Sequence, residues 1–304
     1  MMHARTAAAG LLGILLFCIG TSALYAQPNG PSAPSDTAEQ AGPWVPPLRV
    51  LGRDAVNIAR GPFTLSRAEG GWTLGAVGVL VGTAAVLDEP AFQSLSDRSA
   101  EGASDAWRDA TRLPARPGEW YDRINATHFA LGTVGGLAAG GLLLRHRGLT
   151  RTSVRTVEAL LYTELINGFL KSILNRDRPF VGEEPEPFAY DPGAFSSKHE
   201  KLAMPSGHAA RVFAIASVLS HQADRWYVSV PLYAGATSVG IERVRSGDHW
   251  LTDVLVGGAI GVLVGRSVTV GSELDMGTDE SPSAASIQIA PVLSTRRAGV
   301  AVHF

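Results

Sequence analysis

At residues 243–253 the chain reads Arg-Val-Arg-Ser-Gly-Asp-His-Trp-Leu-Thr-Asp, a polar interval between two apolar segments with helical spacing. The Ser-Gly pair is expected to end the first helix, and Asp248 is well placed to cap the second. His249 then falls in the first turn of the second helix, and Asp253, four residues later, lies on the same face. The interval therefore predicts two helices joined by a short turn, with an imidazole and a carboxylate side by side.

These side chains form the start of an active site for an anionic substrate. A carboxylate beside an imidazole fixes its tautomer, so Asp253 would orient the free nitrogen of His249. The positive end of the helix disfavours imidazolium, which helps to keep the ring a neutral nucleophile. Arg243 adds a charge that cannot be titrated away, in a planar fork that fits phosphate oxygens.

The composition of the 304-residue chain favours closely packed helices and argues against nucleic-acid binding. The net charge is −2, so the chain lacks the basic excess of a nucleic-acid-binding protein. Apolar residues make up 45% of the sequence and charged residues 18%, with 34 glycines, which is typical of small-residue helix packing in or at a membrane. The single cysteine, Cys18, lies in the N-terminal apolar run, so no disulfide is expected in the mature chain.

Six segments have the length and apolar spacing of helices, which predicts an all-α domain over residues 72–270. These segments are residues 72–87, 126–145, 154–174, 207–222, 225–242 and 249–268. A charged, irregular loop is expected at 88–125. A second loop, at 180–204, holds Glu183, Glu184 and Glu186 and is expected to form the rim of the site.

Residues 1–26 are typical of a secretory signal peptide. A basic start precedes an apolar run at 7–20, and small residues lead to a cleavage site near Ala23 or Ala26. An uncleaved anchor helix is the alternative that the length of the run leaves open.

Simpler segments are expected on both sides of the helical domain. Residues 27–71 are rich in Pro, Gly, Ser and Ala, and are expected to form a linker with a short amphipathic helix at 48–59. Residues 271–304 begin as an acidic linker and change to alternating spacing, which predicts two strands, 287–293 and 300–304, around a turn. One β-hairpin cannot close a barrel, so we expect it to pack on the domain.

Two further blocks bring anion-binding groups to the ends of predicted helices. Pro179 pushes Arg178 out of helical geometry, so the third helix must end just before it. Lys171, in the last turns of that helix, and Arg178, at its exit, could then reach one anion; taken alone, they are ordinary cations near a helix C-terminus. Ser206 can cap the fourth helix, whose unpaired N–H groups suit an anion. His208 stands at the rim of that site, where it can protonate a leaving oxygen.

The three blocks follow one another in order, with compact internal spacings. They are Lys171-x6-Arg178-Pro179, Pro205-Ser206-Gly207-His208 and Arg243-x5-His249-x3-Asp253. This pattern resembles the type-2 phosphatidic-acid phosphatase and vanadium haloperoxidase superfamily, over about residues 72–268. In one departure, Glu242 stands where the family often has Ser, which removes one phosphate hydrogen bond but none of the charged groups.

The resemblance implies a six-helix bundle of the acid phosphatase and haloperoxidase type that hydrolyses phosphate esters without a metal or another cofactor. His249 would attack phosphorus and form a phosphohistidine, and Asp253 would orient it. His208 would protonate the leaving group and later activate water. The residues implied to hold the phosphoryl oxygens are Lys171, Arg178, Ser206, Gly207 and Arg243. Phosphoryl transfer asks mainly for positioning and for neutralised charge, which these groups would provide.

Three other functions compete with the phosphatase. His249 and Asp253 could ligate zinc in a metallohydrolase, but three cations in the same pocket would repel a divalent ion. A vanadium-dependent haloperoxidase would use the same residues, although the short chain and the compact blocks favour the phosphatase. An envelope protein with a relict site is the third alternative. The substrate stays open among lipid phosphates, polyprenyl diphosphates, nucleotides and small monoesters, and the oligomeric state stays open too.

Polar residues in the predicted helices disfavour a core that spans a membrane. A bilayer core needs about twenty apolar residues per helix, whereas the third segment carries Glu158, Glu164, Asn167 and Lys171. The resemblance implies an outward-facing site for a membrane member with six spans. With six full spans in this chain, however, a cleaved and an uncleaved N-terminus both place the site on the cytoplasmic side. We therefore expect an exported domain in the periplasm or cell envelope, resting on a membrane surface. The apolar second, fifth and sixth segments favour the alternative, a membrane-embedded core.

Overall fold

The computed structural model describes residues 56, 82, 85–96, 105–181, 186–187, 189–192, 202–277, 288–294 and 297–303. The expected signal peptide, nearly all of the linker with its amphipathic helix, and most of the first helical segment lie outside these residues. The two loops around the predicted site are also described only in part.

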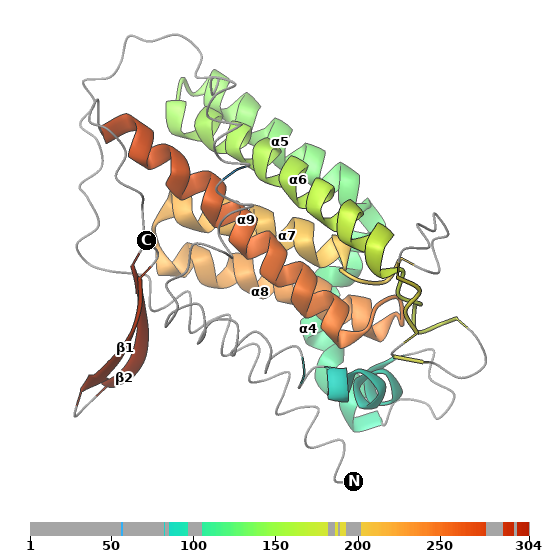
Figure 1. The fold of residues 1–304 in the computed structure, drawn as a ribbon. Helices are drawn as coiled ribbons and strands as arrows, with labels where there is room; N and C mark the ends of the chain where they lie inside the picture. Colours follow the sequence, from blue (N-terminus) through green and yellow to red (C-terminus); the bar gives the residue numbers. More distant parts are fainter. Residues whose placement is uncertain are drawn as a thin grey trace.

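Long helices make up most of the described chain (Figure 1). Residues 85–95 are helical, and they are followed by α4 (Asp105–Ile124), α5 (Ala126–Leu143), α6 (Arg147–Leu174), α7 (Gly207–Ala223), α8 (Trp226–Arg245) and α9 (Leu251–Gly277). The helical fold predicted from the apolar spacing is confirmed. The bounds of α5, α7 and α8 lie within a few residues of the predicted ones, whereas α6 begins earlier and α9 continues further.

Two strands follow the helices. β1 (Gln288–Ser294) and β2 (Arg297–His303) pair in antiparallel register, with Gln288 opposite His303 and Ser294 opposite Arg297. The second strand therefore begins earlier than the predicted 300–304.

The central helix is α7, which packs against α6, α8 and α9, while α5 packs on α6 and α4 on α8 (Figure 1). Two glycines of α9 permit its close approach to α7. A Cβ at Gly257 would overlap the backbone carbonyl of Ser206, and one at Gly261 would overlap that of Ala210. The beginning of α9 is thus held against the beginning of α7, where two of the three sequence blocks meet.

The expected irregular loop at 88–125 is wrong, because this region contains the end of the 85–95 helix and all of α4. Pro114 and Pro117 lie inside α4, and each removes one helical hydrogen bond. Both prolines are exposed, so the carbonyls that they leave unpaired can face water. On the face that packs against α8, the Gly118 N–H donates to Ser238 Oγ at 2.8 Å. Packing on α8 therefore sustains a helix that the prolines obscure in the sequence.

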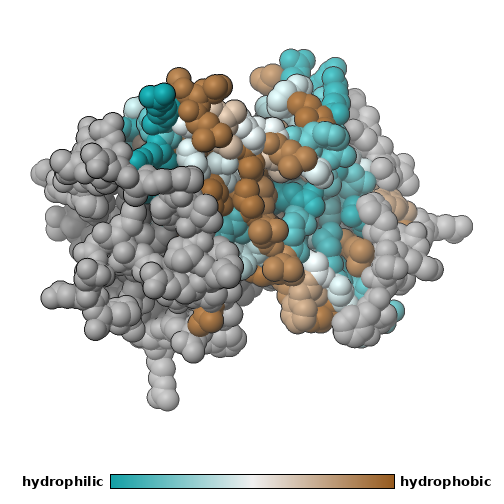
Figure 2. All heavy atoms as spheres, turned by 90° about the horizontal axis from the view of Figure 1, so that it is seen from above, coloured by the Kyte–Doolittle hydropathy of each residue, from teal (hydrophilic) through white to brown (hydrophobic). Residues whose placement is uncertain are grey.

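An apolar surface, the α5–α6 apolar face, is left uncovered by the bundle. Its exposed large side chains are Leu131, Leu142 and Leu143 of α5 and Leu161, Leu165 and Phe169 of α6. Seen from above, apolar residues form bands between hydrophilic areas (Figure 2). Among the described residues, Ala126–Leu143 and Leu251–Thr269 are long and apolar enough to cross a membrane, but only 11% of the first is buried against 56% of the second. The apolar surface of α5 therefore faces outwards, whereas that of α9 is largely used inside the protein.

Candidate active site

The beginning of α7 is built as the second sequence block predicts. Ser206 is the N-cap residue, and its side chain accepts from the Ala209 N–H at 3.5 Å. Its own N–H donates to the Asp253 carbonyl at 2.9 Å, which fixes the cap against α9. A Cβ at Gly207 would come within 3.2 Å of the Asn167 amide nitrogen, so the first turn of α7 lies close to α6. The predicted cap is confirmed, and the N–H groups of this turn lie beside the third block.

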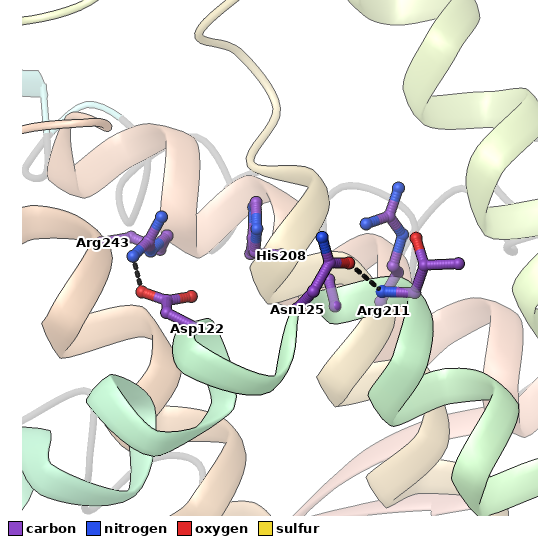
Figure 3. A pocket seen from close by; sticks show the side chains of 7 residues that line it. Asp122, Asn125, His208, Arg211 and Arg243 are labelled. Atoms are coloured by element: carbon purple, nitrogen blue, oxygen red, sulfur yellow. Dashed lines mark hydrogen bonds and ion pairs between the residues drawn. The ribbon is translucent and has the colours of Figure 1, made fainter.

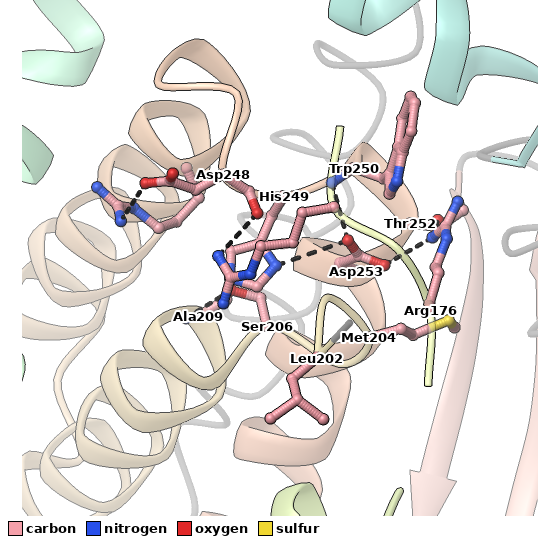
Figure 4. A network of polar contacts seen from close by, with 12 residues as sticks. Arg176, Leu202, Met204, Ser206, Ala209, Asp248, His249, Trp250, Thr252 and Asp253 are labelled. Atoms are coloured by element: carbon pink, nitrogen blue, oxygen red, sulfur yellow. Dashed lines mark hydrogen bonds and ion pairs between the residues drawn. The ribbon is translucent and has the colours of Figure 1, made fainter. Parts of the chain in front are cut away.

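His249 lies just before α9 rather than in its first turn, which corrects the prediction. The helix begins at Leu251, and the Trp250 N–H donates to Asp253 Oδ2 at 2.8 Å (Figure 4). Asp253 therefore caps its own helix from the third position, as in a capping box. His249 Nδ1 faces the same oxygen at 3.6 Å, slightly beyond hydrogen-bond distance, and finds no hydrogen-bond partner among the described residues. The imidazole is buried, with its Nδ1 edge toward the carboxylate.

Asp248 does not cap α9, which is a second correction. Its carboxylate accepts instead from Arg243 Nη1 and from Ser246 Oγ, both at 3.1 Å. The turn between α8 and α9 includes Gly247 at φ 69°, a left-handed conformation that suits glycine. Asp248 therefore holds the third-block arginine in place, and the capping role falls to Asp253.

The cations of the first block converge on the same place. Lys171 Nζ donates to the Leu202 carbonyl at 2.8 Å, and Arg178 Nη1 donates to the Asp248 carbonyl at 2.9 Å. Burial and the nearby Arg178 charge lower the pKa of Lys171 to about 8. Both side chains thus reach across from the end of α6 to the α7 and α9 blocks.

A cavity of about 380 Å³ opens beside His208 (Figure 3). It is lined by Asp122, Asn125, Ala126, Thr127, His208, Arg211 and Arg243. Arg243 is held at its wall by ion pairs with Asp122 and Asp248. Figure 3 places His208 between Arg243 on one side and Arg211 on the other.

Positive charge and burial keep both imidazoles neutral in the free protein. Burial, with the charges of Arg211, Lys171 and Arg178, lowers the pKa of His208 to about 4. Burial and the surrounding cations also lower the pKa of His249 well below its usual value. Each of these pKa values would rise if an anion neutralised the cations.

The structure brings together all eight side chains and backbone groups that the sequence pattern singled out. His249, Asp253, Ser206, Lys171 and Arg178 form the buried part of the cluster, and His208 and Arg243 form the wall of the cavity. His208 and Arg243 also act electrostatically on His249, which joins the two parts. The arrangement can hold a dianionic group between three cations and present a neutral imidazole to it.

The most highly connected residue of the centre, Arg176, was not among the predicted site residues. Its Nη1 donates to Asp253 Oδ1 and to Thr252 Oγ1, both at 2.6 Å, and its Nη2 donates to Asp88 Oδ2 at 2.7 Å (Figure 4). Asp88 in turn accepts from the Thr252 N–H at 2.8 Å. These four residues, the Arg176 network, are buried, and they hold the carboxylate that faces His249.

The sequence contains a signal for Arg176 but none for its partner. Arg176 lies two residues before Arg178 in the first block, close to a helix end and to the predicted site. A buried arginine needs a carboxylate to pair with its charge. Asp88 is separated from it by 88 residues, and no local spacing connects the two. Their contact is a product of the tertiary fold.

The fold and the site together define a helical protein in which two histidines lie among the cations Lys171, Arg178 and Arg243. Residues 153–273 match the family model of the PAP2 superfamily, and they contain all three sequence blocks. The resemblance inferred from the blocks is therefore confirmed.

The chain is also similar to individual proteins. Over 65 residues it is 44% identical to the lipid A 1-phosphatase of Porphyromonas gingivalis, a match that covers 20% of this chain and only 14% of that relative. The crystal structure of Aquifex aeolicus LpxE is 21% identical, with a TM-score of 0.39, and the match covers 60% of this chain and 95% of that one. A transmembrane PAP2-type phosphatidylglycerolphosphate phosphatase from Bacillus subtilis is 18% identical, with a TM-score of 0.36, over 75% of this chain and 96% of that one.

Proposed function

We propose that this chain is a PAP2-type phosphatase that hydrolyses phosphate esters, with lipid phosphates as its substrate class, through a phosphohistidine on His249. The observation that carries the proposal is a buried, neutral imidazole whose Nδ1 faces Asp253 within a ring of three cations. Phosphoryl transfer depends mainly on positioning and on neutralising the equatorial oxygens, and this site is arranged for both.

In the first step, His249 Nε2 attacks phosphorus while Lys171, Arg178 and Arg243 bind the phosphoryl oxygens. The bond between phosphorus and the leaving oxygen breaks, and His208 gives that oxygen its proton. His208 is neutral in the free protein, and the dianionic phosphoryl group restores its proton by offsetting the neighbouring cations. The Nδ1 proton of His249 is held by Asp253, which stabilises the positive ring of the phosphohistidine.

In the second step, water attacks the phosphorus of the phosphohistidine and His208 takes a proton from that water. The bond between phosphorus and His249 Nε2 breaks, so phosphate leaves and the imidazole is regenerated. The Ser206 hydroxyl and the Gly207 N–H, at the beginning of α7, hold the same oxygens through both steps. Glu242, which replaces a serine often found in the family, takes no part in this scheme.

We propose that the reaction needs no metal. Both oxygens of Asp253 are already engaged, one by Arg176 and the other by the Trp250 N–H, so a zinc ion would have to displace them. Within the described ranges, no group of three or more His, Cys, Asp or Glu side chains is placed to hold a metal ion.

A lipid substrate is supported by the α5–α6 apolar face and by the named activity of the Porphyromonas gingivalis relative. Among the described elements, α5 packs mainly on α6 and only slightly on α4 and α7, and a membrane would cover its apolar side. We propose that the domain, a bundle of six helices with the C-terminal hairpin as an appendage, is exported and contacts a membrane. The signal peptide at 1–26 and the linkers at 27–71 and 271–304 remain predictions.

Rapid-quench labelling with radioactive phosphate tests the mechanism. His249→Ala should form no phosphoenzyme and should not turn over, whereas His208→Ala should still be labelled by an aryl phosphate, whose leaving group barely needs a proton. Label that survives in His249→Ala would refute the assignment.

Cofactor use and location have separate tests. Chelators should leave activity intact and vanadate should inhibit, because it mimics the transition state. Loss of activity in EDTA that zinc or magnesium restores would favour a metallohydrolase, and vanadate-dependent bromide oxidation would favour a haloperoxidase. Alkaline phosphatase fusions after Arg145, Lys198 and Gly271 should all be active if the domain is exported whole, and alternating activity would show that the helices span the membrane.

A further inference from the structure

The cavity beside His208 has a second cation that the three sequence blocks do not include. Arg211 lies on α7 one helical turn after His208, so the two Cβ atoms are about 5–6 Å apart. It lines the cavity on the side of His208 away from Arg243 (Figure 3). In the proposed reaction, the phosphoryl group lies among the three cradle cations, and His208 marks the position of the leaving oxygen. Arg211 therefore lies on the leaving-group side.

The contacts of Arg211 leave part of its guanidinium available. Glu164 of α6 accepts from Nε and, at 3.0 Å, from Nη2. No described residue accepts a hydrogen bond from Nη1, and the side chain is 26% exposed. Glu164 thus fixes the plane of the guanidinium and leaves its third nitrogen free to donate.

A buried hydroxyl on Tyr121, whose ring contacts the cavity residue His208, is a second, independent observation. Tyr121 Oη is buried and has no hydrogen-bond partner among the described residues. The Tyr121 ring lies edge-on to the His208 ring, with 6.1 Å between their centroids, and it is affected by the charges of both Arg211 and Arg243. A buried O–H donor that has no partner among the described residues is costly unless an acceptor arrives.

We propose that Arg211 and the Tyr121 hydroxyl bind a second anionic group, carried by the leaving group next to the scissile bond. The site would then prefer phosphate esters whose leaving group is itself anionic, of which a diphosphate monoester is the simplest, over esters with a neutral leaving group. This inference rests on the proposed phosphatase function. Its chemical reason is that negative charge develops on the leaving oxygen as the bond to phosphorus breaks, and a cation on that side stabilises it.

Two matched substrates test the inference: dodecyl phosphate, with a neutral leaving group, and dodecyl diphosphate, with an anionic one. The measured quantity is the ratio of their kcat/KM values, determined on the full chain in detergent micelles. Arg211→Gln should lower the ratio of diphosphate to monophosphate about tenfold or more, as expected when a charge-assisted hydrogen bond is lost. Tyr121→Phe should lower the ratio in the same direction by a smaller factor.

Two further variants provide controls. Glu164→Gln removes the carboxylate that partly neutralises Arg211, so it should raise the ratio. Arg225→Gln makes the same charge change as Arg211→Gln. Arg225 is exposed at the beginning of α8, about 20 Å from Arg211 along the axis of α7. This variant should leave the ratio as in the wild type.

The outcomes separate this inference from the function on which it rests. An Arg211→Gln ratio equal to the wild-type ratio, with both substrates hydrolysed, would overturn the inference alone. Wild-type protein that hydrolyses neither substrate would overturn the proposed phosphatase function and the inference with it. If Arg211→Gln does not fold, a Glu164→Gln ratio that fails to rise overturns the inference.

Discussion

Replacing Arg176 by lysine separates the charge of this residue from its geometry. The guanidinium contacts Asp253, Thr252 and Asp88 at 2.6–2.7 Å, and both Nε and Nη2 donate to the Pro187 carbonyl. A lysine ammonium is a single point with three donors, so it cannot span the two carboxylates as the arginine fork does. One carboxylate would be left buried with its charge incompletely paired.

These contacts set the expected loss of stability and of reaction rate in Arg176→Lys. Each charge-assisted hydrogen bond contributes roughly 1.5–3 kcal/mol, and breaking a buried ion pair costs about 3–5 kcal/mol. Since lysine keeps the charge and at least one contact, we expect Arg176→Lys to lower the free energy of unfolding by about 2–4 kcal/mol. Displacing Asp253 also moves the group that orients His249, so phosphohistidine formation should slow by about 100-fold, as for a misplacement of ~1 Å.

The assay combines denaturant unfolding with rapid-quench labelling, and the rate is expressed per folded molecule. The matched control is Arg155→Lys. Arg155 is a buried arginine within α6 and donates to the Val268 carbonyl of α9. It lies about 24 Å along the helix from Lys171, at the far end of the bundle. The control should lose stability without slowing the labelling. Labelling of Arg176→Lys at the wild-type rate would refute the view that this residue positions Asp253.

Three further predictions concern pH and packing. The pKa of Lys171 is lowered to about 8, so kcat/KM should fall above that pH as the ammonium loses its proton. In a pH–rate profile, Lys171→Arg should abolish this fall at alkaline pH. The pKa values of His208 and His249 are lower in the folded than in the unfolded chain, so this contribution to stability should be complete above pH ~6.5. As the pH drops toward 4, the free energy of unfolding should fall by up to about 1.4 kcal/mol per pH unit for each histidine. Denaturant unfolding measures this fall, and equal stability at pH 7 and pH 5 would contradict it. Gly257→Ala should force α9 away from the Ser206 carbonyl, because a Cβ at this position overlaps that group. Thermal melting should then show a lower Tm, and phosphate should bind more weakly. Unchanged phosphate affinity would show that this contact does not shape the phosphate site.

The parts of the fold that could be predicted are those whose signals are local. Pro179, Ser206 and the Ser-Gly pair before Asp248 mark chain breaks by their own backbone preferences, and the structure breaks at these places. The four-residue spacing of His249 and Asp253 is a local signal as well, and the two side chains do face each other even though α9 begins two residues later than expected.

The parts that could not be predicted depend on contacts between distant segments. The sequence predicts a loop in place of α4 because Pro114 and Pro117 disfavour a helix. The helix is stabilised by its packing on α8 through Gly118. A spacing of buried residues at Thr111, Ala115, Gly118 and Tyr121 follows the helical period, and in the sequence it is masked by polar neighbours. Burial of Arg176 between two carboxylates has no counterpart in any local pattern.

The sequence separations inside the Arg176 network make the centre a late product of chain synthesis. Asp88 contacts Thr252 across 164 residues, and Arg176 contacts Asp253 across 77. A ribosome-bound chain that ends before residue 249 therefore has the guanidinium of Arg176 and the carboxylate of Asp88 awaiting their partners, and lacks the imidazole of His249. Loop closure over such distances is slow compared with local helix formation, so the helices should form first and the network last. Chemical competence is thereby coupled to completion of the domain, because residues 249–253 bring the nucleophile, the carboxylate that faces it and the threonine that binds Asp88 in the 85–95 helix.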